Sequence, residues 1–232
     1  MAGVAMNVMN TVPQVNTTNL ALWLDGEGYS GSGTTWTAYT GSNATLINTP
    51  TYIASSPTYF NFAPASSEYA TVPNLGNKSS WTIEAWFRVT SSLTGQVTMI
   101  VGNEFDLVNK INFSMGTNRA ATSYNICIGY FNGAWRNTAG FAPDLNTWYH
   151  CAGTYNGTTI VQYVNGVSNT TLSYTGTSQS GGEVRIGARW DTLASSTDYF
   201  PGDVAVVRIY NNALTASQVQ QNYLAEYSRF PH

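Results

Sequence analysis

The carboxylates of Glu104 and Asp106 come nearest to a catalytic pair by type and spacing. They occur in the run Glu104-Phe105-Asp106-Leu107-Val108, and alternate positions of a strand share one face. A retaining glycosidase needs two carboxyl groups about 5–5.5 Å apart, which a Glu-x-Asp-x-Glu strand would supply. Val108 stands at the third acidic position. We therefore predict an ordinary strand here, with Glu104 and Asp106 not catalytic.

Nucleophilic catalysis has no candidate constellation either. The two histidines are His150, inside a strand-like run, and His232. A catalytic triad needs a histidine beside a nucleophile and a third group that orients it. The sequence contains no Gly-x-Ser-x-Gly elbow, P-loop or His-Glu-x-x-His helix. We expect His150 to be a packed structural residue and the protein not to be an enzyme.

Aromatic side chains, 13% of the chain, offer a different chemistry, the binding of sugar rings. An exposed tryptophan can stack on a sugar, and a neighbouring carboxylate can accept hydrogen bonds from its hydroxyl groups. Trp135 follows a predicted turn, and Trp190 with Asp191 leads into a polar loop. The alternative is that Trp190 only covers an edge of the fold. The candidate glycan contacts are Tyr130, Trp135, Trp190 and Asp191.

The elements that must position these residues are short strands. In residues 81–89, alternate residues from Ile83 to Val89 are apolar, which is typical of a strand. Asn-Gly pairs at 132, 156 and 165 suit hairpin turns, because both residues accept a positive φ. Short strands at this spacing favour a two-sheet sandwich. The expected strands are 19–25, 44–48, 59–62, 68–72, 81–89, 97–101, 104–108, 111–115, 126–130, 148–155, 159–164, 168–174, 183–187 and 203–210, with a long loop over 26–41.

One helix is expected, near residues 216–225. Thr215 and Gln218 fit a capping box, and Val219 begins an apolar stripe. A length of 232 residues suits one large all-β domain, and no linker or internal repeat interrupts it. We assign residues 1–18 to an N-terminal arm and residues 19–232 to one domain.

Charged residues make up 9% of the chain, against about 25% in an ordinary domain. The net charge is −3, and Lys and Arg are scattered, so nucleic-acid binding is disfavoured. The longest apolar runs are too short to span a membrane, and the N-terminus lacks the features of a secretory signal. Cys127 and Cys151 are expected as free, buried thiols, with a single disulfide as the alternative.

Several motifs, in their order and spacing, resemble the laminin-G-like branch of the concanavalin A-like (pentraxin-type) jelly rolls, of the kind found in phage and viral structural proteins. The resemblance covers residues 19–224 and implies an all-β fold, a two-sheet antiparallel jelly-roll sandwich with one concave sheet. It also implies a binding role, often for glycans. The motifs are Leu22-Trp23-Leu24-Asp25-Gly26, Thr82-Ile83-Glu84-Ala85-Trp86, residues 148–157 and Arg208-Ile209-Tyr210-Asn211.

The same resemblance implies a structural calcium ion at a loop edge. Its candidate ligands here are Asp25 and Asp203, although Ala38 stands where related sequences often carry an aspartate. Calcium takes six to eight oxygen ligands, several of them charged. The alternative is that Asp25 caps a turn and Asp203 caps the last strand.

A binding-type jelly roll without a secretion signal or a catalytic constellation predicts a non-enzymatic virion structural protein. It would be a capsid decoration (cement) protein or a fibre or tail adhesin, with weak glycan binding by outward loops. The uncharged arm, residues 1–18, is expected to contact capsid or other virion proteins rather than its own domain, and a homo-oligomer is expected. The alternatives are a free-standing lectin-like module, extracellular or at a cell surface, and an inactive relative of a jelly-roll glycosidase.

Overall fold

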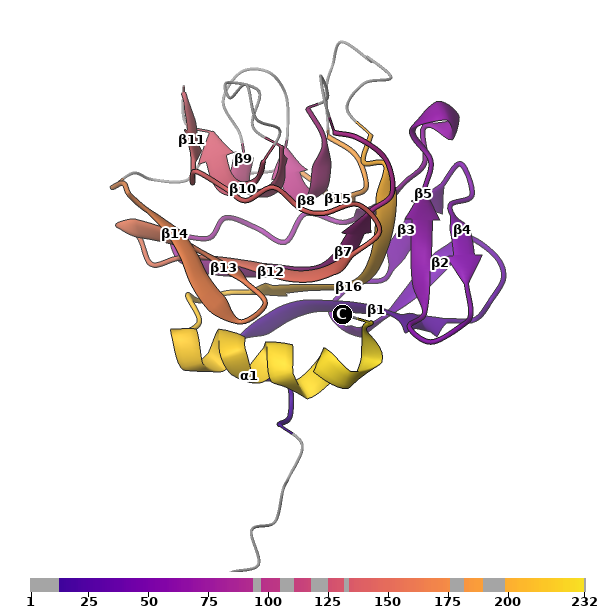
Figure 1. Cartoon of the computed structure of the whole chain (residues 1–232), viewed down its shortest axis with the longest axis horizontal. Coiled ribbons are helices and arrows are strands. Elements are labelled where there is room, and N and C mark those ends of the chain that lie inside the picture. The colour runs from indigo at the N-terminus through magenta and orange to yellow at the C-terminus, as the bar shows by residue number, and fades with distance from the viewer. Residues whose placement is uncertain are drawn as a thin grey trace, which may run out of the picture.

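The computed structural model describes residues 13–93, 97–104, 111–117, 125–131, 134–175, 182–189 and 199–231, which form a layered β-fold (Figure 1). The helical elements are η1 (Pro64–Ser66), α1 (Ala216–Glu226) and η2 (Tyr227–Arg229). The strands are β1 (Leu20–Tyr29), β2 (Thr35–Thr40), β3 (Ala44–Ile47), β4 (Thr51–Ile53), β5 (Tyr59–Phe62), β6 (Tyr69–Val72), β7 (Trp81–Val89), β8 (Met99–Glu104), β9 (Ile111–Thr117), β10 (Ile126–Phe131), β11 (Trp135–Asn137), β12 (Trp148–Tyr155), β13 (Thr159–Val164), β14 (Val167–Ser173), β15 (Val184–Ile186) and β16 (Gly202–Tyr210).

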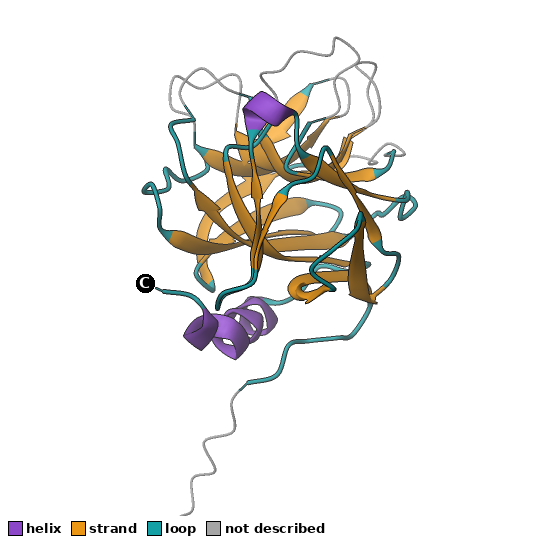
Figure 2. Cartoon of the chain, turned by 90° about the vertical axis from the view of Figure 1, so that its right-hand side faces the viewer, coloured by secondary structure: helices purple, strands orange, loops and turns teal. Residues whose placement is uncertain are grey.

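The strands follow one continuous hydrogen-bonded path. Its order is β11-β10-β9-β8-β15-β6-β3-β2-β1-β16-β7-β12-β13-β14, with β5 pairing both β4 and β16. The path folds back on itself, so that β8, β9, β10 and β15 lie above β7, β12 and β16 in Figure 1, and Figure 2 shows the same layers from the side. The prediction of an all-β fold with one short C-terminal helix is confirmed.

An apolar core fills the space between the layers. Trp81 of β7 contacts Phe113 of β9, with ring centroids 6.0 Å apart. Tyr130 of β10 lies 5.7 Å from Tyr155 of β12. All four side chains are buried. Such aromatic pairs join strands that are not hydrogen-bonded neighbours and so hold the layers together.

Strand β7 is buried on both faces. Its apolar face, at alternate positions from Ile83 to Val89, lies in the core as predicted. Its opposite face carries the buried Glu84 and Trp86, which contact Asn222 and Tyr223 of α1 respectively. Trp86 stacks on Phe230 with ring centroids 4.0 Å apart. A strand with this pattern would leave its second face in water if the helix did not cover it.

Two predicted hairpin turns are confirmed. Asn165 and Gly166 join β13 to β14 and have φ values of 50° and 77°. The Asn156 carboxamide, between β12 and β13, accepts hydrogen bonds from the backbone N–H groups of Thr158 and Thr159. Asparagine and glycine suit both turns because they adopt positive φ or bond nearby backbone. The Asn132-Gly133 pair lies outside the described residues.

Helix α1 begins at the predicted capping box. The Thr215 hydroxyl accepts a hydrogen bond from the backbone N–H of Gln218, and the Gln218 side chain accepts one from the backbone N–H of Thr215. Val219 then packs against Tyr210 of β16. Neither α1 nor any other helix in the described ranges is long and apolar enough to cross a bilayer.

The expectation that residues 26–41 form a long loop is wrong, because this segment contains β2 and the end of β1. Trp36 of β2 is fully buried and donates a hydrogen bond from its indole nitrogen to the Asp25 carbonyl at 2.7 Å. Strand β2 alternates between Trp36 and Ala38, which contact the core, and Tyr39, which is exposed. The glycines and serines just before β2 obscured this short alternation.

The assignment of residues 1–18 to an arm that does not contact its own domain also needs correction, because residues 14–16 bind the domain. The backbone N–H of Asn16 donates to the Asn222 side chain at 2.7 Å, and Tyr210 donates to the Asn16 carbonyl at 3.0 Å. Gln221 donates to the carbonyl of Gln14. The expectation that residues 1–18 contact another subunit rather than the domain is therefore wrong for this stretch. Residues 1–12 lie outside the described ranges.

Candidate functional site

The prediction that Tyr130 contacts a glycan is wrong, because its side chain is fully buried. Its ring lies 5.7 Å from that of Tyr155 and 5.2 Å from that of Tyr174. Ile126, Ile128 and Tyr130 occupy alternate positions of β10 and face the core together. A ring enclosed in this way cannot stack on a sugar.

The other three candidates border the described residues. Trp135 is the first residue of β11, and its side chain, Trp190 and Asp191 lie outside what the structure describes. Asn137 lies two residues after Trp135 on the same strand, and Arg189 directly precedes Trp190. Both neighbours line one depression.

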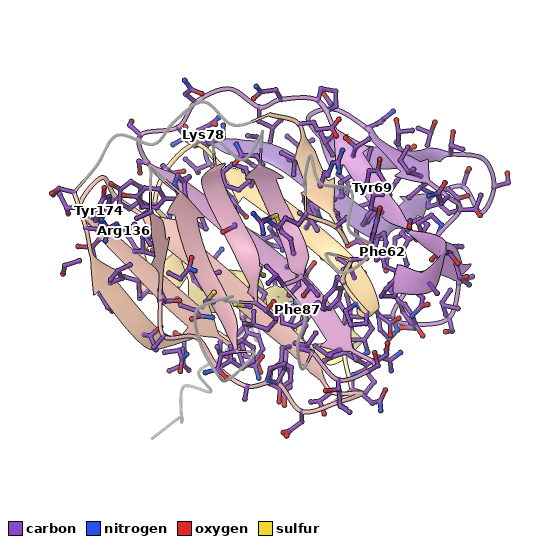
Figure 3. All side chains as sticks on the ribbon, turned by 90° about the horizontal axis from the view of Figure 1, so that it is seen from above. Phe62, Tyr69, Lys78, Phe87, Arg136 and Tyr174 are labelled. Atoms are coloured by element: carbon purple, nitrogen blue, oxygen red, sulfur yellow. The ribbon has the colours of Figure 1, made fainter. Side chains whose placement is uncertain are left out.

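This depression lies on the outward side of β8, β9 and β10, the face toward the viewer in Figure 3. It encloses about 20 Å³, room for one water-sized group. On the other face of β11, the Arg136 guanidinium lies 4.9 Å from the centre of the Tyr174 ring, and both residues are labelled in Figure 3. The depression is lined by Val97, Thr98, Met99, Ser114, Gly116, Thr117, Cys127, Asn137 and Arg189.

Glycines let neighbouring polar groups lie close over this face. A Cβ atom at Gly129 would lie 1.8 Å from the amide oxygen of Asn137, and one at Gly116 would lie 2.2 Å from the carbonyl oxygen of Thr98. Ser114 donates a hydrogen bond to the Gly129 carbonyl at 3.0 Å. Glycine is therefore required where the Asn137 amide crosses β10.

The described lining groups can form hydrogen bonds with a ligand. They are hydroxyls, an amide, a guanidinium, a thiol and a thioether, and none of these described residues carries a carboxylate. Cys127 donates to the Gly116 carbonyl, and burial raises the pKa of its thiol to about 12. Thiolate is the nucleophilic form, so this cysteine is inert near neutral pH. Cys127 and Cys151 are free and buried, as predicted.

The remaining catalytic candidates divide in two. His150 is fully buried, as expected of a packed residue, and its Nε2 lies 3.6 Å from a carboxylate oxygen of Glu84. The Glu104 side chain and the whole of Asp106 lie outside the described residues. Their lack of a catalytic role therefore stays a prediction.

Asp25 and Asp203 do not fit a calcium site, because each carboxylate already binds a guanidinium. Arg229 donates to both oxygens of Asp25, at 2.7 and 2.8 Å. Arg88 and Asn61 each donate to Asp203 at 2.7 Å. Within the described ranges, no group of three or more His, Cys, Asp or Glu residues is placed to hold a metal ion. The expected calcium ligands are thus corrected to ion-pair partners.

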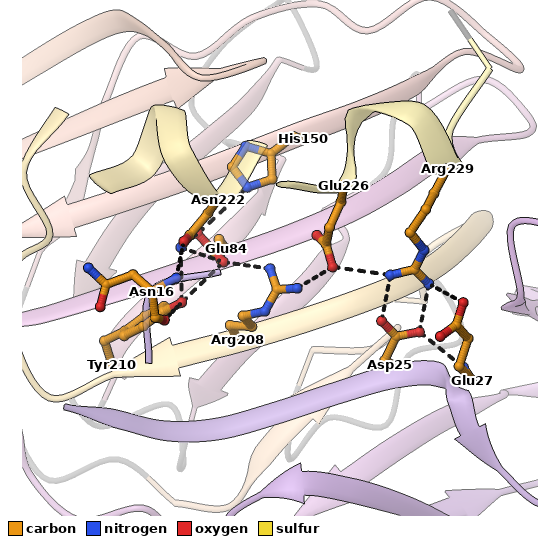
Figure 4. Close-up of polar contacts among 10 residues, drawn as sticks. All are labelled: Asn16, Asp25, Glu27, Glu84, His150, Arg208, Tyr210, Asn222, Glu226 and Arg229. Carbon is orange, nitrogen blue, oxygen red and sulfur yellow. Dashed lines mark hydrogen bonds and ion pairs between the residues drawn. The ribbon is translucent and has the colours of Figure 1, made fainter. Parts of the chain in front are cut away.

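Asp25 ends a buried chain of alternating charges between the sheet and the C-terminal segment (Figure 4). Arg208 donates to Glu84 at 2.8 Å and also to Glu226. Arg229 then bonds Glu226 at 3.1 Å and Asp25. Each guanidinium lies between two carboxylates, which is the condition under which buried charges are tolerated. This series of ion pairs attaches α1 and η2 to β1, β7 and β16.

The charge of Glu84 is fixed by its neighbours. Burial by itself would raise the pKa of Glu84, but His150, Arg208 and Asn222 outweigh burial and lower this pKa to about 2. Burial would lower the pKa of Arg208, but Glu226 and Glu84 raise it overall. Both groups stay ionised at neutral pH, and neither is tuned to exchange a proton. We conclude that this cluster is structural.

Sequence and structure comparisons agree with this architecture. The model of the concanavalin A-like lectin/glucanases superfamily matches residues 64–220. No curated protein sequence matches the chain.

Three solved structures illustrate the likeness in fold. Domain 4 of AbnA, an extracellular GH43 arabinanase from Geobacillus stearothermophilus in complex with arabinotriose, is 18% identical with a TM-score of 0.66, covering 89% of this chain and 98% of that one. Trypanosoma rangeli sialidase is 17% identical with a TM-score of 0.66, covering 94% of this chain and 34% of the sialidase. The botulinum neurotoxin serotype C1 binding domain is 14% identical with a TM-score of 0.67, covering 89% and 52%. The chain thus spans about a third of the sialidase, and these identities show the fold alone.

Proposed function

The chain belongs to the concanavalin A-like lectin/glucanases superfamily, and from that premise we propose that it is a non-catalytic carbohydrate-binding module. We assign the two layers of its sheet to the two sheets of a jelly roll. The observation that carries the proposal is the depression on the outward side of β8–β10, whose described lining residues offer hydrogen-bonding groups and include no carboxylate pair. A glycosidase of the usual kind needs that pair.

The sugar is held in this proposal by a polar floor and aromatic walls. Ser114 and Asn137 lie in the floor, whose small volume suits one hydroxyl group of a sugar. Trp135 lies two residues before Asn137, and Trp190 directly follows Arg189 of the lining. In this proposal the two tryptophans supply stacking surfaces, and Asp191 accepts hydrogen bonds from the hydroxyl groups. One hydroxyl-sized notch gives weak single-site binding, so many copies are needed for strong adhesion.

A glycan array followed by titration tests this function. Trp135→Ala with Trp190→Ala should weaken binding to the best glycan about tenfold, or 1.4 kcal/mol. Val167→Ala, at a 64% exposed position on β14, is the matched control and should bind normally. Unchanged binding in the double variant would refute the site. Polysaccharide hydrolysis that disappears in Glu104→Gln would instead identify a glycosidase.

The second candidate function is a virion decoration protein or a fibre or tail adhesin, located on the particle. One observation favours an attached module. The chain enters the domain beside α1, on the side away from β8–β10 (Figures 1 and 2). Attachment of residues 1–12 to a capsid protein would therefore leave the depression facing outward, with homo-oligomers adding avidity.

Electron microscopy of native assemblies tests that second candidate. Density for this domain on a particle surface would support it. A monomeric protein that is absent from particles would leave the free-standing lectin-like module, extracellular or at a cell surface.

A further inference from the structure

A second aromatic surface lies where β1 pairs with β2, on the side of the sheet that carries α1. The Tyr39 side chain is 51% exposed and meets Trp23 edge to face, with centroids 5.2 Å apart. The Arg208 guanidinium lies 4.6 Å from the centre of the Trp23 ring. Tyr39 is therefore an exposed ring supported by a buried cation–aromatic stack, on paired strands rather than a loop.

Charged groups surround this ring. Glu27 lies two positions beyond Asp25 on β1, which places both on the Trp23 face of the strand. Its side chain is 56% exposed and lies 3.4 Å from Arg229, which is 22% exposed. Burial, then Asp25 and Glu27, raise the pKa of Tyr39, so the two carboxylates act on the phenol. The ion pair of Glu27 and Arg229 thus lies on the same face of the sheet as the exposed Tyr39 ring.

The structural alternative is that Tyr39 only shields Trp23 from water. A shield needs apolar area but no exposed carboxylate held in place beside it. Glu27 is held by Arg229, which also binds the buried Asp25 and Glu226. Positioned polar groups around an exposed ring are the arrangement that recognises a sugar, where the ring covers the apolar face and the polar groups meet the hydroxyls.

We propose that Tyr39, Glu27 and Arg229 form a second glycan-binding site, which prefers neutral or amino sugars to acidic ones. Tyr39 stacks on a pyranose ring and Glu27 accepts hydrogen bonds from its hydroxyl or ammonium groups, while Arg229 holds the Glu27 carboxylate in place. The preference follows from charge. Glu27 presents an exposed carboxylate, and the Arg229 guanidinium beside it already pairs with the buried Asp25, so a sugar carboxylate is repelled.

This site goes beyond the proposed function and does not require the depression. The depression is on the outward side of β8–β10. Tyr39 instead contacts Trp23, whose ring lies against Arg208 of the ion-pair cluster beneath α1. Two sites on opposite sides would let one chain bridge two glycans.

The test measures binding of the whole chain to neutral, amino-sugar and sialylated oligosaccharides. Tyr39→Ala should weaken binding of neutral or amino sugars at least tenfold, while Tyr39→Trp keeps it. Glu27→Gln should narrow the preference for these sugars over sialylated ones. Leu145→Ala, with the same 51% exposure away from this surface, is the matched control.

The outcomes separate this site from the depression. Tyr39→Ala that lowers thermal stability but leaves every affinity unchanged would show a shield and overturn the proposal. Binding lost in the Trp135/Trp190 double variant but normal in Tyr39→Ala would keep the proposed function and refute only this site. No binding of any glycan by the wild type would refute both. Bridging of glycan-coated beads that either variant abolishes would support two sites.

Discussion

The buried carboxylate of Glu84 accepts a hydrogen bond from the buried guanidinium of Arg208 at 2.8 Å. The two residues are register partners on β7 and β16. Asn222 of α1 donates to both oxygens of Glu84, at 3.1 and 3.0 Å. Two charges removed from water are tolerated only when their remaining hydrogen-bonding groups also have partners. Helix α1 is therefore needed to complete the hydrogen bonding of the buried pair.

Glu84→Gln should lower the free energy of unfolding by about 3 kcal/mol, because it leaves Arg208 with one buried carboxylate partner in place of two. Urea denaturation measures the change. The matched control is Glu183→Gln, whose pair with Arg185 at 2.9 Å is partly exposed. That control should cost under about 1 kcal/mol. Equal effects in the two variants would contradict a special role for the buried pair.

Acid should remove the stability that the ionised Glu84 contributes to the folded state. The pKa of Glu84 falls from an ordinary 4.5 to about 2 on folding, so its ionisation stabilises the folded state above pH 4.5. This stability, about 3 kcal/mol, is lost as the pH falls from 4.5 toward 2, because the unfolded chain takes up the proton first. Unfolding free energies measured across this range should fall less steeply in Glu84→Gln. Identical slopes in variant and wild type would contradict this.

The parts of the fold that the sequence predicted rest on local signals. The period-2 pattern of β7, the Asn165-Gly166 turn and the Thr215–Gln218 capping box each lie within a few residues and appear as predicted. The alternation of Ile126, Ile128 and Tyr130 was a local signal too, and it would have placed Tyr130 in the core.

The site was less predictable because its decisive contacts are distant in sequence. Asp25 is an acceptable calcium ligand by residue type, and nothing near it shows that Arg229, from the other end of the chain, binds it. The arm appeared free for the same reason, since Asn16 bonds Asn222. The depression joins β8, β9, β10 and β11 with Arg189, which requires the fold to be known first.

Both thiols should be unreactive in the folded protein. Burial raises the pKa values of Cys127 and Cys151 to about 12, although a hydrogen bond from Gln162 opposes this at Cys151. Thiolate is therefore scarce at pH 8. A thiol reagent should label neither cysteine in the native protein and should label both in urea. Rapid labelling of either native thiol would contradict the buried environment.

Thr215→Ala should destabilise the protein by about 1 kcal/mol, because the backbone N–H of Gln218 loses its acceptor. Thermal unfolding measures the loss. Ser217→Ala is the matched control in the same first turn, since that side chain is exposed. It should change stability by less than about 0.5 kcal/mol. A Thr215→Ala variant as stable as this control would show that the cap contributes nothing.

Truncation of the N-terminus should have a sharp boundary. Deleting residues 1–13 removes no hydrogen bond described here and should change the free energy of unfolding by less than about 0.5 kcal/mol. Deleting residues 1–18 removes the Asn16 backbone groups, which pair with the buried side chains of Asn222 and Tyr210. Leaving those groups unpaired should cost about 2 kcal/mol. Asn16→Ala keeps the backbone groups and should be as stable as the wild type. A loss of about 2 kcal/mol in Asn16→Ala, or no loss on deletion of residues 1–18, would show that the Asn16 backbone does not stabilise the domain through Asn222 and Tyr210.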